Sequence, residues 1–181
     1  MALSVKRAER TVEVCLDGTL LGEWEATDAE YKRARAEQAA NRDKRMNDPQ
    51  AKRVEELLQK ARELSEKARK ASVTFRLRAL PRAEWDAIVT AHPADSEKSA
   101  LPFDAKSVTD AALSTEGAIV SVTRASGRKE SFSHGDWEAF ANDLSSSQHD
   151  DFQAAVVSLN AGANEVPFLP GSAPITGSAK S

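Results

Sequence analysis

The sequence predicts an α+β fold. A small antiparallel N-terminal sheet is expected to carry a projecting antiparallel helical hairpin of the coiled-coil type. An α-rich C-terminal part with a β-hairpin is expected to follow. Three observations predict this fold. Apolar and polar residues alternate over positions 11–16 and 73–80, as in half-buried strands. Strong helix formers fill the stretch between them. After residue 81, tryptophan and phenylalanine recur at helical spacing.

The first element is expected to be a β-hairpin. Residues 11–16 are rich in β-branched types, which favours a strand. Asp17-Gly18 follows, and this pair supplies the positive φ angles of a tight turn. Residues 19–25 are therefore expected to return as a second strand, with Gly22 marking a bulge.

A helical hairpin is expected over about residues 27–71. Thr27-Asp28-Ala29-Glu30 matches a capping box, and Pro49 suits the first position of a second helix over about 50–71. The apolar residues of that second helix are spaced alternately three and four positions apart, the pattern of a narrow coiled-coil seam: Val54, Leu57, Ala61, Leu64, Ala68 and Ala71. Leu58 widens the seam. The first helix is poorer in apolar residues, so the tip is expected to be loosely packed.

Residues 73–80 give the clearest strand. Its alternate apolar side chains face one side, while Arg76 and Arg78 face the other. Because an antiparallel helical hairpin returns the chain to its starting point, this strand is expected to join the N-terminal hairpin. Residues 1–80 are thus expected to form one domain, a three-stranded sheet with the helical hairpin inserted.

Residues 81–168 are expected to form an α-rich C-terminal domain. Trp85 and Trp137 each precede another large apolar residue by three positions, which is typical of a helix face turned to the core. A β-hairpin around Gly127 is expected within residues 118–133. Residues 169–181 are rich in Gly, Pro, Ser and Ala, and we expect this tail to be disordered.

The composition of the 181 residues suits a modest core, with 40% hydrophobic and 29% charged residues. The net charge of −3 is the sum of +4 over residues 1–80 and −7 over residues 81–181, an asymmetry that favours self-association of copies head to tail. No apolar run is long enough to span a membrane, and a single cysteine excludes a disulfide framework. A cytoplasmic protein is expected.

No residue constellation points to catalysis, and neither a metal nor another cofactor is expected. His92, His134 and His149 stand far apart, and the carboxylates after His149 are typical of a helix N-terminus. Cys15 lies in a predicted strand without a neighbouring base, which favours a structural role.

Partner binding is the remaining class of function. The candidate surface is the seam of the second helix, together with Arg76 and Arg78 on the third strand; the alternatives for this arginine pair are protecting a sheet edge or pairing with glutamates. The seam residues considered are Val54, Leu57, Leu58, Ala61 and Leu64. An alternative function is a structural coiled-coil protein that oligomerises. A nucleic-acid-binding regulator is not favoured, because residues 28–71 hold 13 basic and nine acidic residues but only Tyr31 for stacking on bases.

The order of the segments carries a resemblance. The segment from Arg10 to Gly18 leads into a charged helical hairpin, and the segment from Val73 to Pro81 follows that hairpin. A tryptophan-bearing helix then ends at His92-Pro93, and Leu159-Asn160 and Val166-Pro167-Phe168 stand near the end. Over about residues 10–168 the chain resembles the tail assembly chaperone family of siphophages that infect actinobacteria.

The resemblance implies a protein that acts in the host cytoplasm and is not expected in the mature virion. Members of this family are thought to bind the long, helix-rich tape measure protein before the tail tube subunits polymerise around it. A longer form, made by a programmed ribosomal frameshift, is thought to recruit the tail tube protein. The tail from Leu169 fits a junction to such an extension.

Overall fold

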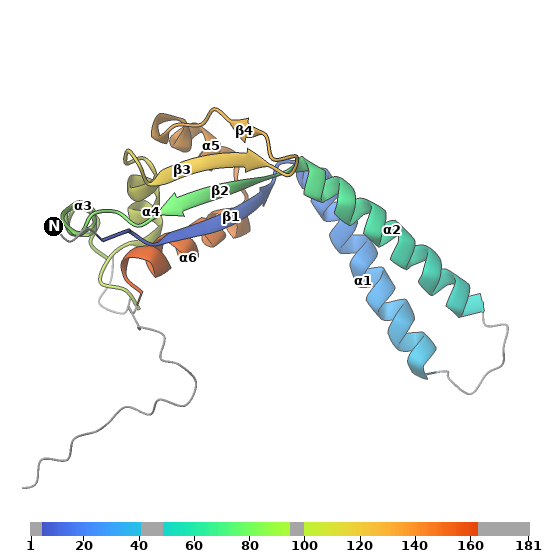
Figure 1. The fold of residues 1–181 in the computed structure, drawn as a ribbon. Helices are drawn as coiled ribbons and strands as arrows, with labels where there is room; N and C mark the ends of the chain where they lie inside the picture. The colour runs from blue at the N-terminus through green and yellow to red at the C-terminus, as the bar shows by residue number, and fades with distance from the viewer. Residues whose placement is uncertain (1–4, 41–48, 95–99, 163–181) are drawn as a thin grey trace, which may run out of the picture.

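The structure is a computed structural model, and it describes residues 5–40, 49–94 and 100–162. It confirms the predicted α+β fold. Two long helices, α1 (Gly18–Ala40) and α2 (Pro49–Ala71), project from a body of strands and shorter helices (Figure 1). We call these two helices together the arm, and all the other described elements the head.

The head contains one antiparallel sheet of four strands in the order β1-β2-β3-β4. The strands are β1 (Glu9–Cys15), β2 (Ser72–Arg78), β3 (Ile119–Arg124) and β4 (Lys129–Glu130). Val12 lies opposite Phe75, which in turn lies opposite Val122, and all three are buried. Because opposite residues share a face of a sheet, these side chains define the covered face.

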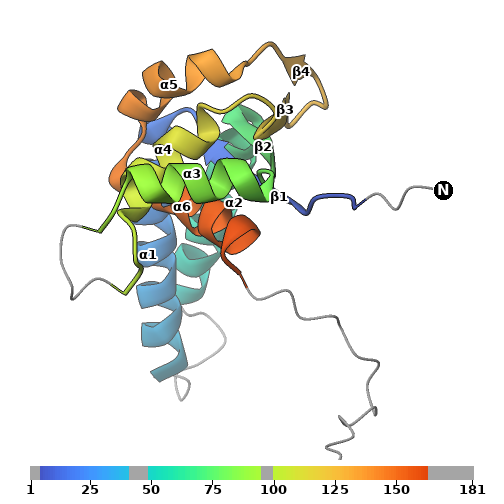
Figure 2. The same cartoon turned by 90° about the vertical axis from the view of Figure 1, so that its left-hand side faces the viewer.

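Four helices accompany the sheet: α3 (Arg82–Ala91), α4 (Ala105–Leu113), α5 (Trp137–Asp143) and α6 (Ser146–Asn160). The helices α4, α5 and α6 lie on one side of the sheet (Figure 2). Local sequence signals fix where they begin. Asp104 caps α4, and Ser145 and Gln148 form a capping box at α6.

The core of the head is built from aromatic rings. Phe75 of β2 lies 5.0 to 5.2 Å, between ring centroids, from Phe132, Phe140 and Phe152. Trp137 packs against Phe152 at 4.9 Å, and Trp85 packs against Phe103 at 5.7 Å. Both tryptophans are buried, which confirms the predicted core-facing helix stripes. No described residue of the arm belongs to this hydrophobic cluster.

The predicted N-terminal β-hairpin is wrong, because α1 starts where the turn was expected. The Asp17 side chain accepts hydrogen bonds from the amides of Thr19 and Leu20, so it caps a helix. Aspartate favours both helix caps and tight turns, and here it caps a long helix that packs along α2. Gly22 lies inside α1 rather than at a bulge, and Thr27 is a buried residue of that helix rather than a cap.

The predicted three-stranded sheet is wrong as well. The partner of β2 on its second side is β3, which follows α4 in the chain, so residues before and after position 80 share one sheet. The β-hairpin within 118–133 is confirmed, with Gly127 at a φ of 83° in its turn. The helical-hairpin tip at 41–48 and the tail at 169–181 lie outside the described residues. Within the described ranges, no helix is long and apolar enough to cross a membrane.

Candidate partner-binding arm

The arm is inserted at a single point of the sheet. Cys15 at the end of β1 lies opposite Ser72 at the start of β2, and the Leu16 amide donates to the Ala71 carbonyl at 3.2 Å. Each helix has 23 residues and so extends about 35 Å at 1.5 Å per residue. The chain therefore leaves the head and returns to it at neighbouring positions, and α1 and α2 lie side by side (Figure 1).

The two helices meet along a thin seam. On α1, a row of buried or half-buried residues has positions spaced alternately four and three apart. The row consists of Leu20, Trp24, Thr27, Tyr31, Ala34 and Gln38. Of these, only Thr27 and Ala34 are fully buried. On α2 the buried residues are Ala61 and Leu64. Because these four side chains include two alanines and a threonine, the arm buries little apolar area.

The predicted site residues on α2 divide into two groups. Ala61 and Leu64, at 7% and 6% exposure, are covered within the arm itself. Val54, Leu57 and Leu58 are half-buried and retain accessible apolar surface. A partner therefore has access to the second group, whereas it reaches the first group only if the two helices separate.

The other two predicted site residues, Arg76 and Arg78, lie on the sheet face away from the core. The Arg78 guanidinium donates two hydrogen bonds to the Glu9 carboxylate at 2.7 and 2.8 Å, and Arg76 lies 3.6 Å from the second oxygen of that carboxylate. The bond from Arg78 holds the pKa of Glu9 below its usual range. Both arginines therefore pair with a glutamate, which is one of the alternative roles considered for them in the sequence analysis.

The surface of the arm is nearly neutral. Residues 18–40 and 49–71 carry ten basic and nine acidic side chains. Arg53 on α2 forms an ion pair with Glu30 on α1 at 2.8 Å, and other pairs, such as Lys32 with Asp28, lie along one helix. Such exposed pairs each contribute little to stability. Mixed charge of this kind does not favour binding to a polyanion.

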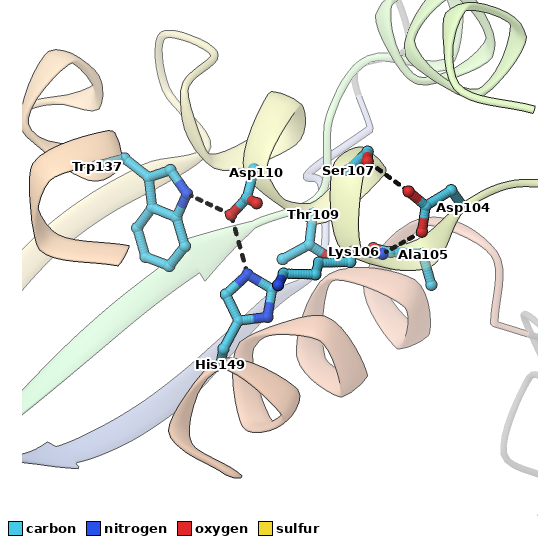
Figure 3. A network of polar contacts seen from close by, with 8 residues as sticks. All are labelled: Asp104, Ala105, Lys106, Ser107, Thr109, Asp110, Trp137 and His149. Carbon is cyan, nitrogen blue, oxygen red and sulfur yellow. Dashed lines mark hydrogen bonds and ion pairs between the residues drawn. The ribbon is translucent and has the colours of Figure 1, made fainter. Parts of the chain in front are cut away.

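A partly buried polar network ties together three helices of the head (Figure 3). One carboxylate oxygen of Asp110 on α4 accepts from the Trp137 indole of α5 at 3.1 Å and lies 2.9 Å from Nε2 of His149 on α6. His149 is buried. The predicted helix N-terminus at this histidine is confirmed, and its contact is with Asp110. Among the described residues, no group of three or more His, Cys, Asp or Glu side chains is arranged to hold a metal ion.

Sequence reasoning missed the contribution of residues 18–26 of α1 to the arm. Leu20, Trp24 and Thr27 continue the same alternating spacing as Tyr31 and Ala34, so the signal is present in the sequence. It was masked by Asp17-Gly18, which imitates a hairpin turn, and by Gly22. Cys15, expected to be structural, is half-buried, and its thiol faces the Ala68 carbonyl at 3.7 Å.

No protein-family model matches the chain, and neither a curated protein nor a solved structure matches it.

Proposed function

We propose that the protein is a non-catalytic assembly factor that binds a helical client along its arm. One observation carries the proposal: the arm adds no described residue to the hydrophobic cluster of the head, yet it extends about 35 Å from it. An element of this length that does not support the core is suited to reaching another molecule. Val54, Leu57 and Leu58 are the half-buried apolar side chains that it offers.

The physical basis is a helix laid beside two others. An amphipathic client helix that covers Leu57 and Leu58 removes their remaining apolar surface from water, and full burial of one leucine is worth about 1.5–3 kcal/mol. Because only part of each side chain remains exposed, one arm binds weakly. Many copies along a long client together keep its apolar stripe from self-association.

Within this class, we propose that the protein is a phage tail assembly chaperone and that its client is the tape measure protein. The order of strand, charged helical hairpin, strand and tryptophan-bearing helix supports the proposal, and the proposed client is itself long and helical. In this account a longer frameshifted form recruits tail tube subunits, and the protein acts in the host cytoplasm. A slippery heptamer in the coding sequence of residues 160–181 is the expected genetic sign.

The test is co-expression with the tape measure protein of the same genome. Leu57→Asp combined with Leu58→Asp should abolish co-purification, because two carboxylates would be buried against the client. The matched control is Ala36→Asp with Ala39→Asp, which adds the same charge at two exposed positions of α1. Leu64 is unsuitable for this test, because it is buried inside the arm and its loss would separate the helices. The proposal would be contradicted if the Leu57 and Leu58 double variant retained as much tape measure protein as the control double variant does.

Oligomerisation through the arm is the second candidate function, because the heptad-like spacing of both helices also suits contacts between copies. Sedimentation of the purified chain distinguishes the two. A structural oligomer would be favoured by two results together. The chain would form a tight oligomer that Leu57→Asp with Leu58→Asp converts to monomer, and that oligomer would show no affinity for the tape measure protein.

A further inference from the structure

A cleft of about 810 Å³ lies where the arm joins the head. Its walls come from β1, the first turns of α1, the last turns of α2, the start of β2 and the first turns of α6. It is separate from Val54, Leu57 and Leu58, none of which lines it. The cleft is therefore a different surface from the one proposed to bind the client along the arm.

The floor of the cleft is apolar. Leu21 and Trp24 of α1 line it together with Cys15 and Ala68, and all four are half-buried. The other two tryptophans of the chain are buried in the head, so Trp24 is the one left partly accessible. A half-covered tryptophan in a cleft is the kind of residue that dominates binding energy at protein interfaces.

Small residues line the cleft on both helices of the arm. Gly18 and Gly22 lie one turn apart on α1, and Ser65 and Ala68 face the cleft from α2. Glycine weakens a helix interior, yet a Cβ at Gly22 would meet no atom within 4 Å, and neither glycine has a positive φ. Neither the backbone nor internal packing thus requires glycine at position 22. Close approach of another backbone does require a small residue there.

The rim of the cleft is acidic. Glu13, Glu25 and Asp151 line it, and none of them forms an ion pair with a described residue. The basic residue of the lining is Arg69, whose guanidinium donates two hydrogen bonds, at 2.8 and 2.9 Å, to Glu66. The cleft therefore presents three carboxylates against one arginine, which Glu66 binds and Glu13 also attracts, so negative charge is in excess and favours a cationic ligand.

The starts of α1 and α6 at this cleft are the competing feature, since helix N-termini attract anions. Both starts are capped within the chain. Asp17 accepts from the amides of Thr19 and Leu20, and the Ser145 hydroxyl accepts from the Gln148 amide. Because these amides are already bonded, the carboxylates of the rim decide the sign of the preferred charge.

We propose that this cleft binds a cationic amphipathic helix of a partner protein. An aliphatic or aromatic side chain of that helix packs against Trp24 and Leu21, its backbone approaches Gly22, and its lysines or arginines face Glu13, Glu25 and Asp151. Binding at this cleft is independent of the function proposed for the arm, because it uses a different surface and does not require the tape measure protein.

The test uses the full chain and three labelled synthetic helices with fluorescence anisotropy. The first is built from leucine and lysine, the second has glutamate in place of lysine, and the third has serine in place of leucine. Only the first should bind measurably. Equal binding of the leucine and glutamate helix would overturn the proposal, because charge complementarity would then play no part.

Variants locate the site. Glu25→Lys with Asp151→Lys should weaken binding about tenfold, because two attractive pairs become repulsive. The matched control Glu56→Lys with Glu63→Lys makes the same charge change on exposed α2 positions outside the cleft and should leave the affinity within about twofold.

Gly22→Leu fills the cleft without changing its charge and improves the helix propensity of α1, so it should also weaken binding about tenfold or more while the circular dichroism of the arm is kept. Its control is Ala36→Leu, at an exposed position of the same helix. Undiminished binding by both the charge-reversed variant and Gly22→Leu would overturn the proposal, since the peptide would then bind elsewhere.

Discussion

The head and the arm of this molecule use hydrophobic packing in opposite ways. In the head, Phe75, Phe152 and Trp137 are at most 1% exposed, and Phe152 contacts both of the other rings in a single aromatic cluster. In the arm, the buried side chains of the described residues are Thr27, Ala34, Ala61 and Leu64. The head is thus stabilised by its own core, whereas the arm retains apolar surface that a partner is able to cover.

The largest effect is expected in the head. Phe75→Ala should lower the free energy of unfolding by about 3–5 kcal/mol, because the ring leaves a cavity among three other phenylalanines. Urea unfolding followed by near-ultraviolet circular dichroism measures it. Leu57→Ala in the arm should cost about 1 kcal/mol or less. Similar losses for both variants would contradict the difference between head and arm.

A smaller and more local effect is expected inside the arm. Leu64→Ala removes the largest of the fully buried side chains of its seam and should cost about 2 kcal/mol. Because the arm shares no described core residue with the head, hydrogen exchange should quicken in α1 and α2 while the amides of β2 and α6 stay protected. Faster exchange throughout β2 and α6 would show that head and arm unfold together.

The polar network of the head gives the next prediction. Asp110→Ala leaves the Trp137 indole and His149 without their shared acceptor, and it should cost about 1–3 kcal/mol. Asp110→Asn keeps an acceptor oxygen at nearly the same place and should cost less. Chemical denaturation of the two variants checks this, and equal losses would show that the loss of charge, rather than of the acceptor, matters.

The smallest effect concerns acid stability at the start of α4. The Ser107 hydroxyl, with the Lys106 and Ser107 amides, lowers the pKa of Asp104 from its usual value. A carboxyl whose pKa is lower in the folded state stabilises the fold above its unfolded pKa of about 3.9, and that contribution is lost as the pH falls below this value. Asp104→Asn should therefore show a smaller drop in Tm between pH 6 and pH 3 than the unmodified protein. If the drop in Tm were the same in both proteins, Asp104 would not contribute to the loss of stability in acid.

The sequence predicts most of the head and the second helix of the arm, but it does not predict where the arm begins. Strands β1, β2 and β3 and the tryptophan-bearing helices α3 and α5 follow from the alternation or the helical spacing of their own apolar residues. Asp17-Gly18 is different, because an aspartate suits a turn and a helix cap equally well. The packing of α1 along α2 decides between them, and that packing joins residues far apart in the sequence.

The candidate site was predictable only in part for the same reason. Alternating spacing identified the apolar face of α2, but spacing alone does not say how much of that face α1 covers. Leu64 and Ala61 are covered, whereas Leu57 and Leu58 remain half-buried. The cleft at the base of the arm joins residues from β1, α1, α2 and α6, so no single stretch of sequence indicates it.

The most direct test of the central claim is to remove the arm. Leu16 and Ala71 are hydrogen-bonded neighbours, so an Asn-Gly turn can replace residues 17–70. We expect this variant to keep the cooperative unfolding transition of the head. The deciding measurement is its co-purification with co-expressed tape measure protein, compared with that of the full chain. The armless head should recover none of the client. Recovery equal to that of the full chain would contradict the claim that the arm is the binding element.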